Sequence, residues 1–180
     1  MSRIPADVAG RPLVVTATVD ADTQEYWDWL RRTWFPPDRL QVGAHITLFH
    51  ALPGEHLDSV GADCAVLAGE TSRFTLAVTG VRSLGRGVAL ALDSPELVSV
   101  HSVLRSRWLR WLTPQDRQPL KPHVTVQNKV GAATAAATLA TLRQEITPST
   151  ARVTGLAVWR YLGGPWEPIS RHEFSGTVPV

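Results

Sequence analysis

The chain has 180 residues, 44% of them hydrophobic, and 18 Lys and Arg against 16 Asp and Glu leave a net charge of +2. These values fit one globular domain with a sizeable core, and the nearly balanced charge permits a polyanionic partner without requiring one. No apolar run approaches the roughly 18 to 20 residues of a membrane span, so we expect neither membrane insertion nor secretion. The single Cys64 excludes an internal disulfide, and we expect a protein of the reducing cytoplasm.

The first half of the chain alternates strand and helix patterns. Residues 12–19 are apolar and β-branched and predict a strand. Either Asp20 or Asp22 could cap the helix that we expect from Thr23 to Trp34. Phe35-Pro36-Pro37 ends that helix, because a residue before Pro is disfavoured in the helical conformation. The other elements predicted in this half are a strand over residues 44–52, a helix over residues 55–68, and a strand pair over residues 74–81 and 87–94.

The second half repeats this order of elements. Ser94-Pro95 predicts the start of a helix that runs to about Leu112, because Ser is a favoured cap and Pro fits the first turn. The elements predicted after it are a strand over residues 123–130, a helix over residues 132–146, and a hairpin around Gly163-Gly164. The repetition predicts one α+β domain over residues 1–180, with two pseudo-symmetric lobes of antiparallel sheet and outer helices around a central cleft, roughly one lobe per half.

Two His-x-Thr motifs lie at matching places in the two halves. They are His45-Ile46-Thr47-Leu48 and His123-Val124-Thr125-Val126, both in strand-like runs. Thr occupies 17 of the 180 positions, so one such motif has roughly a one in ten chance of arising by accident, whereas two matched copies are far less accidental. Alternate residues of a strand share a face, so each His points to the same side as its Thr. Only a fold that brings the two halves together makes these motifs one site.

The residue types of the two motifs suit chemistry at a phosphodiester. In-line displacement needs a base for the attacking oxygen and an acid on the opposite side for the leaving oxygen. Because imidazole has a pKa near 6.5, a neutral and a protonated histidine can coexist near neutral pH, so His45 and His123 are candidates for these roles. The hydroxyl groups of Thr47 and Thr125 can donate hydrogen bonds to nonbridging phosphate oxygens.

Side chains near the motifs are candidates for substrate binding. Lys129 shares the face of His123 if the second motif strand continues to residue 130, which makes it the first candidate for stabilising phosphate charge. Lys121 and Arg117 are nearby in sequence and are weaker candidates. Phe49 could stack on a base or pack within its own lobe.

The two motifs resemble those of the 2H phosphoesterase superfamily, which includes the bacterial RNA 2′,3′-cyclic phosphodiesterases, also called 2′-5′ RNA ligases. The stretch FPPDRLQVGAHITLFHALPG is similar to a bacterial branch with HxTx motifs. The resemblance implies a bilobal α+β fold and chemistry without a metal or cofactor on cyclic or 2′-5′ nucleotide phosphodiesters. It also implies catalytic roles for His45 and His123, with Thr47 and Thr125 on the phosphate. The bacterial RNA enzymes often carry an Arg shortly after the second motif, where this chain has Gln127-Asn128-Lys129.

Two other hypotheses stay open. The first is a nucleotide- or RNA-binding module that keeps the phosphate pocket but performs no turnover, which single-turnover assays with cyclic nucleotides would distinguish. The second is a metal-dependent hydrolase that uses His45, His50 and a carboxylate, which activity in excess chelator would exclude. For the leading hypothesis we expect a monomer whose partner is a nucleotide or RNA with a cyclic or 2′-5′ phosphodiester, and no membrane contact.

Overall fold

The computed structural model describes residues 6–177 of the chain. The strands are β1 (Leu13–Val19), β2 (Ile46–Leu52), β3 (Phe74–Ser83), β4 (Val88–Asp93), β5 (His123–Gln127), β6 (Ser149–Tyr161) and β7 (Trp166–Glu173). The α-helices are α1 (Ala6–Ala9), α2 (Ala21–Trp34), α3 (Leu57–Glu70), α4 (Pro95–Trp108) and α5 (Ala132–Glu145). Single 3₁₀ turns occupy Pro37–Arg39 and Gly54–His56.

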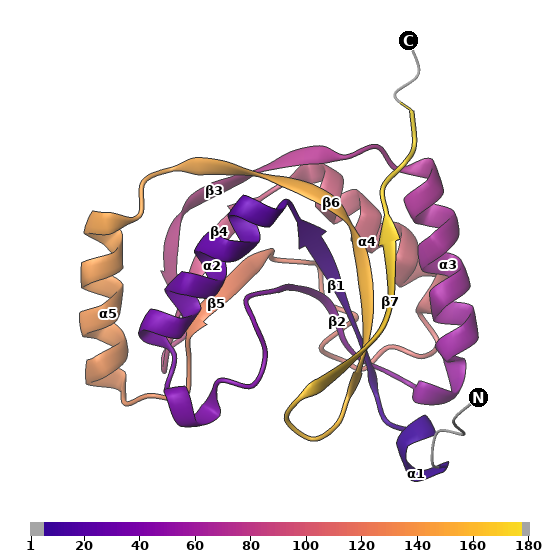
Figure 1. The fold of residues 1–180 in the computed structure, drawn as a ribbon, viewed down its shortest axis with the longest axis horizontal. Coiled ribbons are helices and arrows are strands. Elements are labelled where there is room, and N and C mark those ends of the chain that lie inside the picture. Colours follow the sequence, from indigo (N-terminus) through magenta and orange to yellow (C-terminus); the bar gives the residue numbers. More distant parts are fainter. Residues whose placement is uncertain (1–5, 178–180) are drawn as a thin grey trace.

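The strands form one curled antiparallel sheet (Figure 1). Its order is β2-β1-β6-β3-β4-β5, and β7 pairs with β6 outside this path. The long strand β6 joins the two sides, since its first residues pair with β3 and its later residues pair with β1 and β7. The sheet curls so far that β2 and β5, at opposite ends of the order, contact each other. One His-x-Thr motif begins β5, and the other begins at the residue directly before β2, so the curl brings the two motifs together.

Helices α2 to α5 cover the outside of the curled sheet in two pairs. Helix α5 packs on β3 and β4, and α2 packs on β5, so a helix from the first half of the chain lies against the strand of the second motif (Figure 1). Helix α3 packs on β6 and β7 and also contacts α4. The predicted α+β class, with antiparallel sheet and outer helices arranged as two lobes, is confirmed. The expected division into roughly one lobe per half of the chain is wrong, because β6 from the second half pairs with β1, and α2 from the first half packs on β5. No helix within residues 6–177 is long and apolar enough to cross a membrane.

Helix α2 has an acidic cap as predicted, but it begins at Ala21, two residues before the expected Thr23. The Asp20 carboxylate accepts a hydrogen bond from the Thr23 N–H at 3.0 Å, which satisfies one of the free donors at the helix start. Its second oxygen accepts from the Arg152 N–H on β6, also at 3.0 Å. Of the two predicted caps, Asp20 is therefore the one that caps α2, and its bond to Arg152 also connects the start of the helix to the sheet.

Helix α4 confirms its predicted start but ends earlier than expected. The Ser94 hydroxyl accepts from the Leu97 N–H at 3.1 Å, as expected for a Ser cap followed by Pro. The helix ends at Trp108 rather than near Leu112. Residues 109–111 form a turn, and Pro114 follows, so the chain cannot continue the helical hydrogen bonds there. Trp108 is fully buried and helps to fill the core between α4 and β2.

Candidate active site

The two motif histidines are anchored in the same way. His45 directly precedes β2, and its Nδ1 lies 2.7 Å from the Gly43 carbonyl oxygen. His123 begins β5, and its Nδ1 lies 2.9 Å from the Lys121 carbonyl oxygen. A carbonyl oxygen only accepts, so Nδ1 carries the proton in each ring and donates it. Each neutral imidazole therefore keeps Nε2 free to accept a proton.

Helix α2 positions the backbone that carries His45. The Gln24 side chain donates to the Ala44 carbonyl at 2.9 Å, and the Asp28 carboxylate accepts from the Ala44 N–H at 2.6 Å. Both backbone groups of the residue before His45 are therefore bonded to the same helix. Because α2 also packs on β5, the helix sets the first motif histidine relative to the second motif.

Arg31 links the two motif segments directly. It is only 7% exposed, and its Nε donates to the Val42 carbonyl at 3.0 Å while its Nη1 donates to the Thr125 carbonyl at 2.6 Å. Its guanidinium lies 4.2 Å from the centre of the Phe35 ring. Burial lowers the pKa of Arg31 to about 10 against the opposing charge of Asp28. The side chain remains a cation at neutral pH and places positive charge between the motifs.

The electrostatic surroundings keep His45 neutral. Burial lowers its pKa to about 4, against the opposing hydrogen bond to Gly43. The charges of Arg31, His123 and His50 contribute to this lowered pKa. The contribution of His123 means that the two motif histidines lie within electrostatic reach of each other. This agrees with the contact between β2 and β5.

Arg82 faces the second motif from β3. It pairs with Ala89 on β4, and Ala89 pairs with Thr125 on β5, so these three residues share one face of the sheet. Burial lowers the pKa of His123, the hydrogen bond to Lys121 opposes that shift, and the charge of Arg82 lowers the pKa further. The buried Nε of Arg82 has no hydrogen-bond partner within the described part of the chain. Sequence reasoning missed this residue, because its place depends on the order of the strands.

The motif threonines lie in the strands as predicted. Thr47 pairs with Thr16 on β1, and Thr125 pairs with Ala89 on β4. Both side chains are half-buried, whereas the apolar residues that precede and follow them in the strands are buried. Each hydroxyl group therefore lies on the face of its strand that is turned away from the apolar core.

Phe49 belongs to the core rather than to a substrate site. It pairs with Val15 while Thr47 pairs with the next residue of β1, so Leu48 is an extra residue that bulges β2. The bulge interrupts the alternation from which the position of Phe49 is predicted. Phe49 is 0% exposed and packs against His101 and Trp108, with ring centres 4.7 and 4.9 Å apart. The prediction that Phe49 could stack on a substrate base is therefore wrong, and the alternative, packing within its own lobe, is correct.

The strand of the second motif is shorter than predicted. It ends at Gln127, whose side chain is buried and donates to Thr138 of α5 at 2.8 Å. Lys129 has a φ of 62°, a left-handed conformation that no regular strand contains. The prediction that Lys129 reaches the face of His123 by strand alternation is therefore wrong. Arg117 is bonded to its own turn, where its Nε donates to the Leu112 carbonyl at 3.1 Å.

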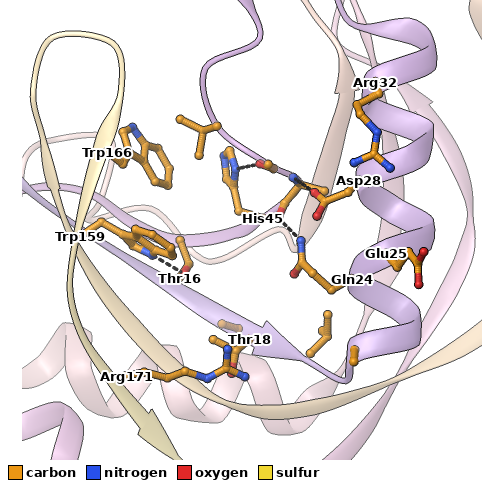
Figure 2. A pocket seen from close by; sticks show the side chains of 16 residues that line it. Thr16, Thr18, Gln24, Glu25, Asp28, Arg32, His45, Trp159, Trp166 and Arg171 are labelled. Carbon is orange, nitrogen blue, oxygen red and sulfur yellow. Dashed lines mark hydrogen bonds between the residues drawn. The ribbon is translucent and has the colours of Figure 1, made fainter.

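Two pockets adjoin at His45 and Trp166, which line both. The larger has a volume of about 750 Å³ and lies between α2 and strands β1, β6 and β7. Figure 2 shows Trp166 and Trp159 on one side of it and side chains of α2 on the other. The Trp166 ring centre lies 4.6 Å from that of His45, and the Trp159 indole N–H donates to the Thr16 hydroxyl at 2.9 Å.

The smaller pocket, of about 410 Å³, is rich in cations. Arg31, Arg39 and Lys129 line it together with Asp38, so Lys129 lies near His45 although it has left the strand. His123, Thr47 and Thr125 do not line either of these two pockets. Within residues 6–177, no cluster of three or more His, Cys, Asp or Glu side chains is arranged to hold a metal ion.

The pocket residues show where sequence reasoning fell short. Trp166 lies near a predicted hairpin turn, and nothing local indicates that it packs on His45. Arg171, which lines the larger pocket from β7, is likewise invisible without the pairing of β7 with β6. Neither residue belongs to a recognisable motif, so only the three-dimensional arrangement reveals them.

Comparisons with known proteins agree with this architecture. The fold is similar to that of Escherichia coli LigT complexed with 3′-AMP, with a TM-score of 0.63 and 22% identity over 92% of this chain and 99% of that chain. It is also similar to TT0787 of Thermus thermophilus, with a TM-score of 0.65 and 17% identity over 92% of this chain and 98% of that chain. No curated protein gives a significant match. At these identities the structural likeness shows the fold.

The family is shown by the sequence itself. Residues 19–165, which are most of the chain, match the family model described as the 2′-5′ RNA ligase superfamily. This match and the LigT-like fold confirm the resemblance to the 2H phosphoesterases that the two His-x-Thr motifs indicate. The chain belongs to the 2′-5′ RNA ligase superfamily.

Proposed function

We propose that the protein is a metal-independent phosphodiesterase that acts on cyclic, 2′,3′-type, or 2′-5′ phosphodiesters of nucleotides or RNA. The observation that carries the proposal is the meeting of two identically anchored His-x-Thr motifs where the edge strands β2 and β5 contact each other. Two histidines within electrostatic reach, each with its Nε2 free, supply the acid and the base that in-line displacement requires.

His45 and His123 exchange protons with the reacting oxygens. One neutral imidazole takes the proton of the attacking oxygen, and the other, protonated, gives a proton to the leaving oxygen. The backbone carbonyls of Gly43 and Lys121 hold each ring by Nδ1, which keeps Nε2 as the reactive atom in both roles. The roles interchange when the reaction reverses, so the same pair serves hydrolysis and ligation.

Thr47, Thr125 and nearby cations bind the phosphate in this proposal. The two hydroxyl groups donate to nonbridging oxygens. Arg82 shares the face of Thr125, and its Nε, which has no hydrogen-bond partner among residues 6–177, can donate to an anion. Lys129 contributes positive charge from the smaller pocket beside His45. Donors already in place before the reaction stabilise transition-state charge without reorganisation.

The larger pocket is suited to the nucleoside part of the substrate. It adjoins His45, is large enough for a nucleoside at about 750 Å³, and presents the Trp166 and Trp159 rings beside polar side chains. The E. coli relative of similar fold has been crystallised in complexes with 3′-AMP, ATP and NADP+. These complexes support a nucleotide as the class of ligand.

Turnover of a small substrate panel tests the proposal. The panel is the nucleoside 2′,3′-cyclic monophosphates and a 2′-5′-linked dinucleotide, incubated in excess chelator with wild type, His45→Ala and His123→Ala. Each substitution is expected to lower kcat/KM by roughly 10² to 10⁴-fold, because each removes one proton-transfer group. His56→Ala is the matched control, since His56 lies outside both motifs, in the 3₁₀ turn after β2, and its ring stacks on Trp111 with ring centres 3.9 Å apart.

The outcome separates the proposal from its alternatives. Cleavage that survives chelator and disappears in both motif variants supports metal-free two-histidine chemistry. Cleavage lost with chelator and restored by a divalent cation would support the metal-dependent hydrolase. No turnover, together with binding of 3′-AMP by the wild type, would support the binding-module hypothesis.

A further inference from the structure

The bulge in β2 brings a third histidine to the side of the motif residues. In a regular strand His50 would face opposite His45. The extra residue Leu48 shifts the alternation after Thr47, so Leu48 and Phe49 both enter the core and are 2% and 0% exposed. The His50 side chain is instead 44% exposed. It therefore lies on the side away from the core, as Thr47 does.

A buried carboxylate holds the His50 ring. Asp116, in the turn after α4, is 3% exposed and accepts from the His50 Nδ1 at 2.9 Å. It also accepts from the backbone N–H groups of His50 and Ala51, at 2.9 and 3.0 Å. Burial raises the pKa of Asp116, but the bonds from His50 and Ala51 outweigh it and leave the pKa below its ordinary value. The carboxylate is therefore ionised at neutral pH.

This bonding defines what His50 can do. A carboxylate only accepts, so Nδ1 of His50 donates to it and Nε2 is left for another partner. A buried, ionised carboxylate also fixes the ring orientation. The backbone N–H groups of His50 and Ala51 already bind the Asp116 turn to β2. The attachment of this turn to the strand therefore does not require the His50 ring. With Leu48 bulged out of the alternation, the His50 ring follows Thr47 on the same side of β2, and its charge contributes to the lowered pKa of His45 and of His123.

We propose that His50, oriented by Asp116, is a third substrate-contacting imidazole, whose Nε2, in the protonated ring, donates a hydrogen bond to a phosphate oxygen of the substrate. The contact supplies binding rather than proton transfer, because His45 and His123 already fill the acid and base roles. Asp116 acts through His50 and is a positioning residue. The inference rests on the proposed function for its substrate, a phosphodiester, but it concerns a residue outside both motifs.

The kinetic test compares His50→Asn, Asp116→Asn and the double variant on adenosine 2′,3′-cyclic monophosphate. A charge-assisted hydrogen bond to phosphate predicts that His50→Asn raises KM about tenfold with little change in kcat. Asp116→Asn should raise KM in the same direction, and the double variant should be no worse than His50→Asn, because the two residues act as one unit. His56→Asn is the control, because His56 lies in the 3₁₀ turn after β2, outside both motifs, and its ring stacks on Trp111.

A structural role predicts a different result. If the pair only fastens the turn to β2, the variants lower Tm while KM stays at the wild-type value, and that result overturns the inference. Independent effects of the two substitutions on KM would overturn the positioning role of Asp116.

A binding measurement keeps this test separate from the proposed function. Calorimetric titration with inorganic phosphate needs no turnover, and His50→Asn is expected to weaken phosphate binding about tenfold. An unchanged affinity, or a wild type that binds no phosphate, overturns the inference even if cyclic nucleotides are cleaved. If His50→Asn weakens phosphate binding but the wild type shows no turnover, the contact of His50 with phosphate is supported. Only the proposed phosphodiesterase activity is then contradicted.

Discussion

At the scale of single residues, the site depends on imidazoles whose pKa is lowered by their surroundings. Burial is the largest cause for His45 and His123, and neighbouring positive charges add to it. A bound phosphodiester brings negative charge into this cluster of cations, which favours protonation of one ring when substrate arrives. The free protein therefore keeps neutral histidines beside cations, a combination suited to an anionic substrate.

The lowered pKa of His45 makes stability depend on pH. Its pKa is about 4 in the folded protein and near 6.5 in the unfolded chain, so between these values the unfolded state binds the extra proton. This contribution to the free energy of unfolding is full above pH 6.5 and is lost as the pH falls toward 4. Burial lowers the pKa of His101 to about 4 as well, with the same sign.

We therefore expect the free energy of unfolding to fall between about pH 6.5 and 4, and to fall less in His45→Gln. Urea unfolding of both proteins at about pH 7, 5.5 and 4.5 measures the difference. Parallel curves for wild type and variant would show that His45 is not held neutral by the fold.

At the scale of elements, local sequence patterns predicted the positions of helices and strands but not their irregularities. Caps such as Asp20 and Ser94 act within one turn of the chain, so a local pattern is enough to find them. The bulge at Leu48 depends on the partner strand β1, and the end of β5 depends on the left-handed backbone at Lys129. Alternation along a strand assumes regular pairing, so it predicts the wrong positions for Phe49 and Lys129.

The bulge leads to a test of Phe49. Because the side chain is fully buried between His101 and Trp108, Phe49→Ala is expected to lower the free energy of unfolding by about 3–5 kcal/mol. Tyr26→Ala, an exposed aromatic on α2, should change it by less than about 0.5 kcal/mol. Chemical denaturation measures both. A Phe49→Leu variant of wild-type stability but raised KM would return Phe49 to the substrate site.

At the scale of the whole molecule, the site exists because the sheet curls. The repeat of elements in the two halves predicted that the motifs meet, and the contact of β2 with β5 brings their strands together. The contacts that bring the strands together could not be predicted, because they join residues that lie far apart in the sequence. Strand β6, near the end of the chain, pairs with both β1 and β3, and Arg31 of α2 reaches across to the Thr125 carbonyl. Only the curl of the sheet brings Arg31, Arg82 and Trp166 to the motif residues.

The central claim is that both histidines act on one phosphate, and a double-mutant cycle tests it most directly. We would measure kcat/KM on a nucleoside 2′,3′-cyclic monophosphate for wild type, His45→Ala, His123→Ala and the double variant. When two groups act as a unit, removing either one abolishes the contribution of both. The kcat/KM of the double variant should therefore be about as low as that of the worse single variant. Losses that multiply, or a single variant with full activity, would contradict a shared site.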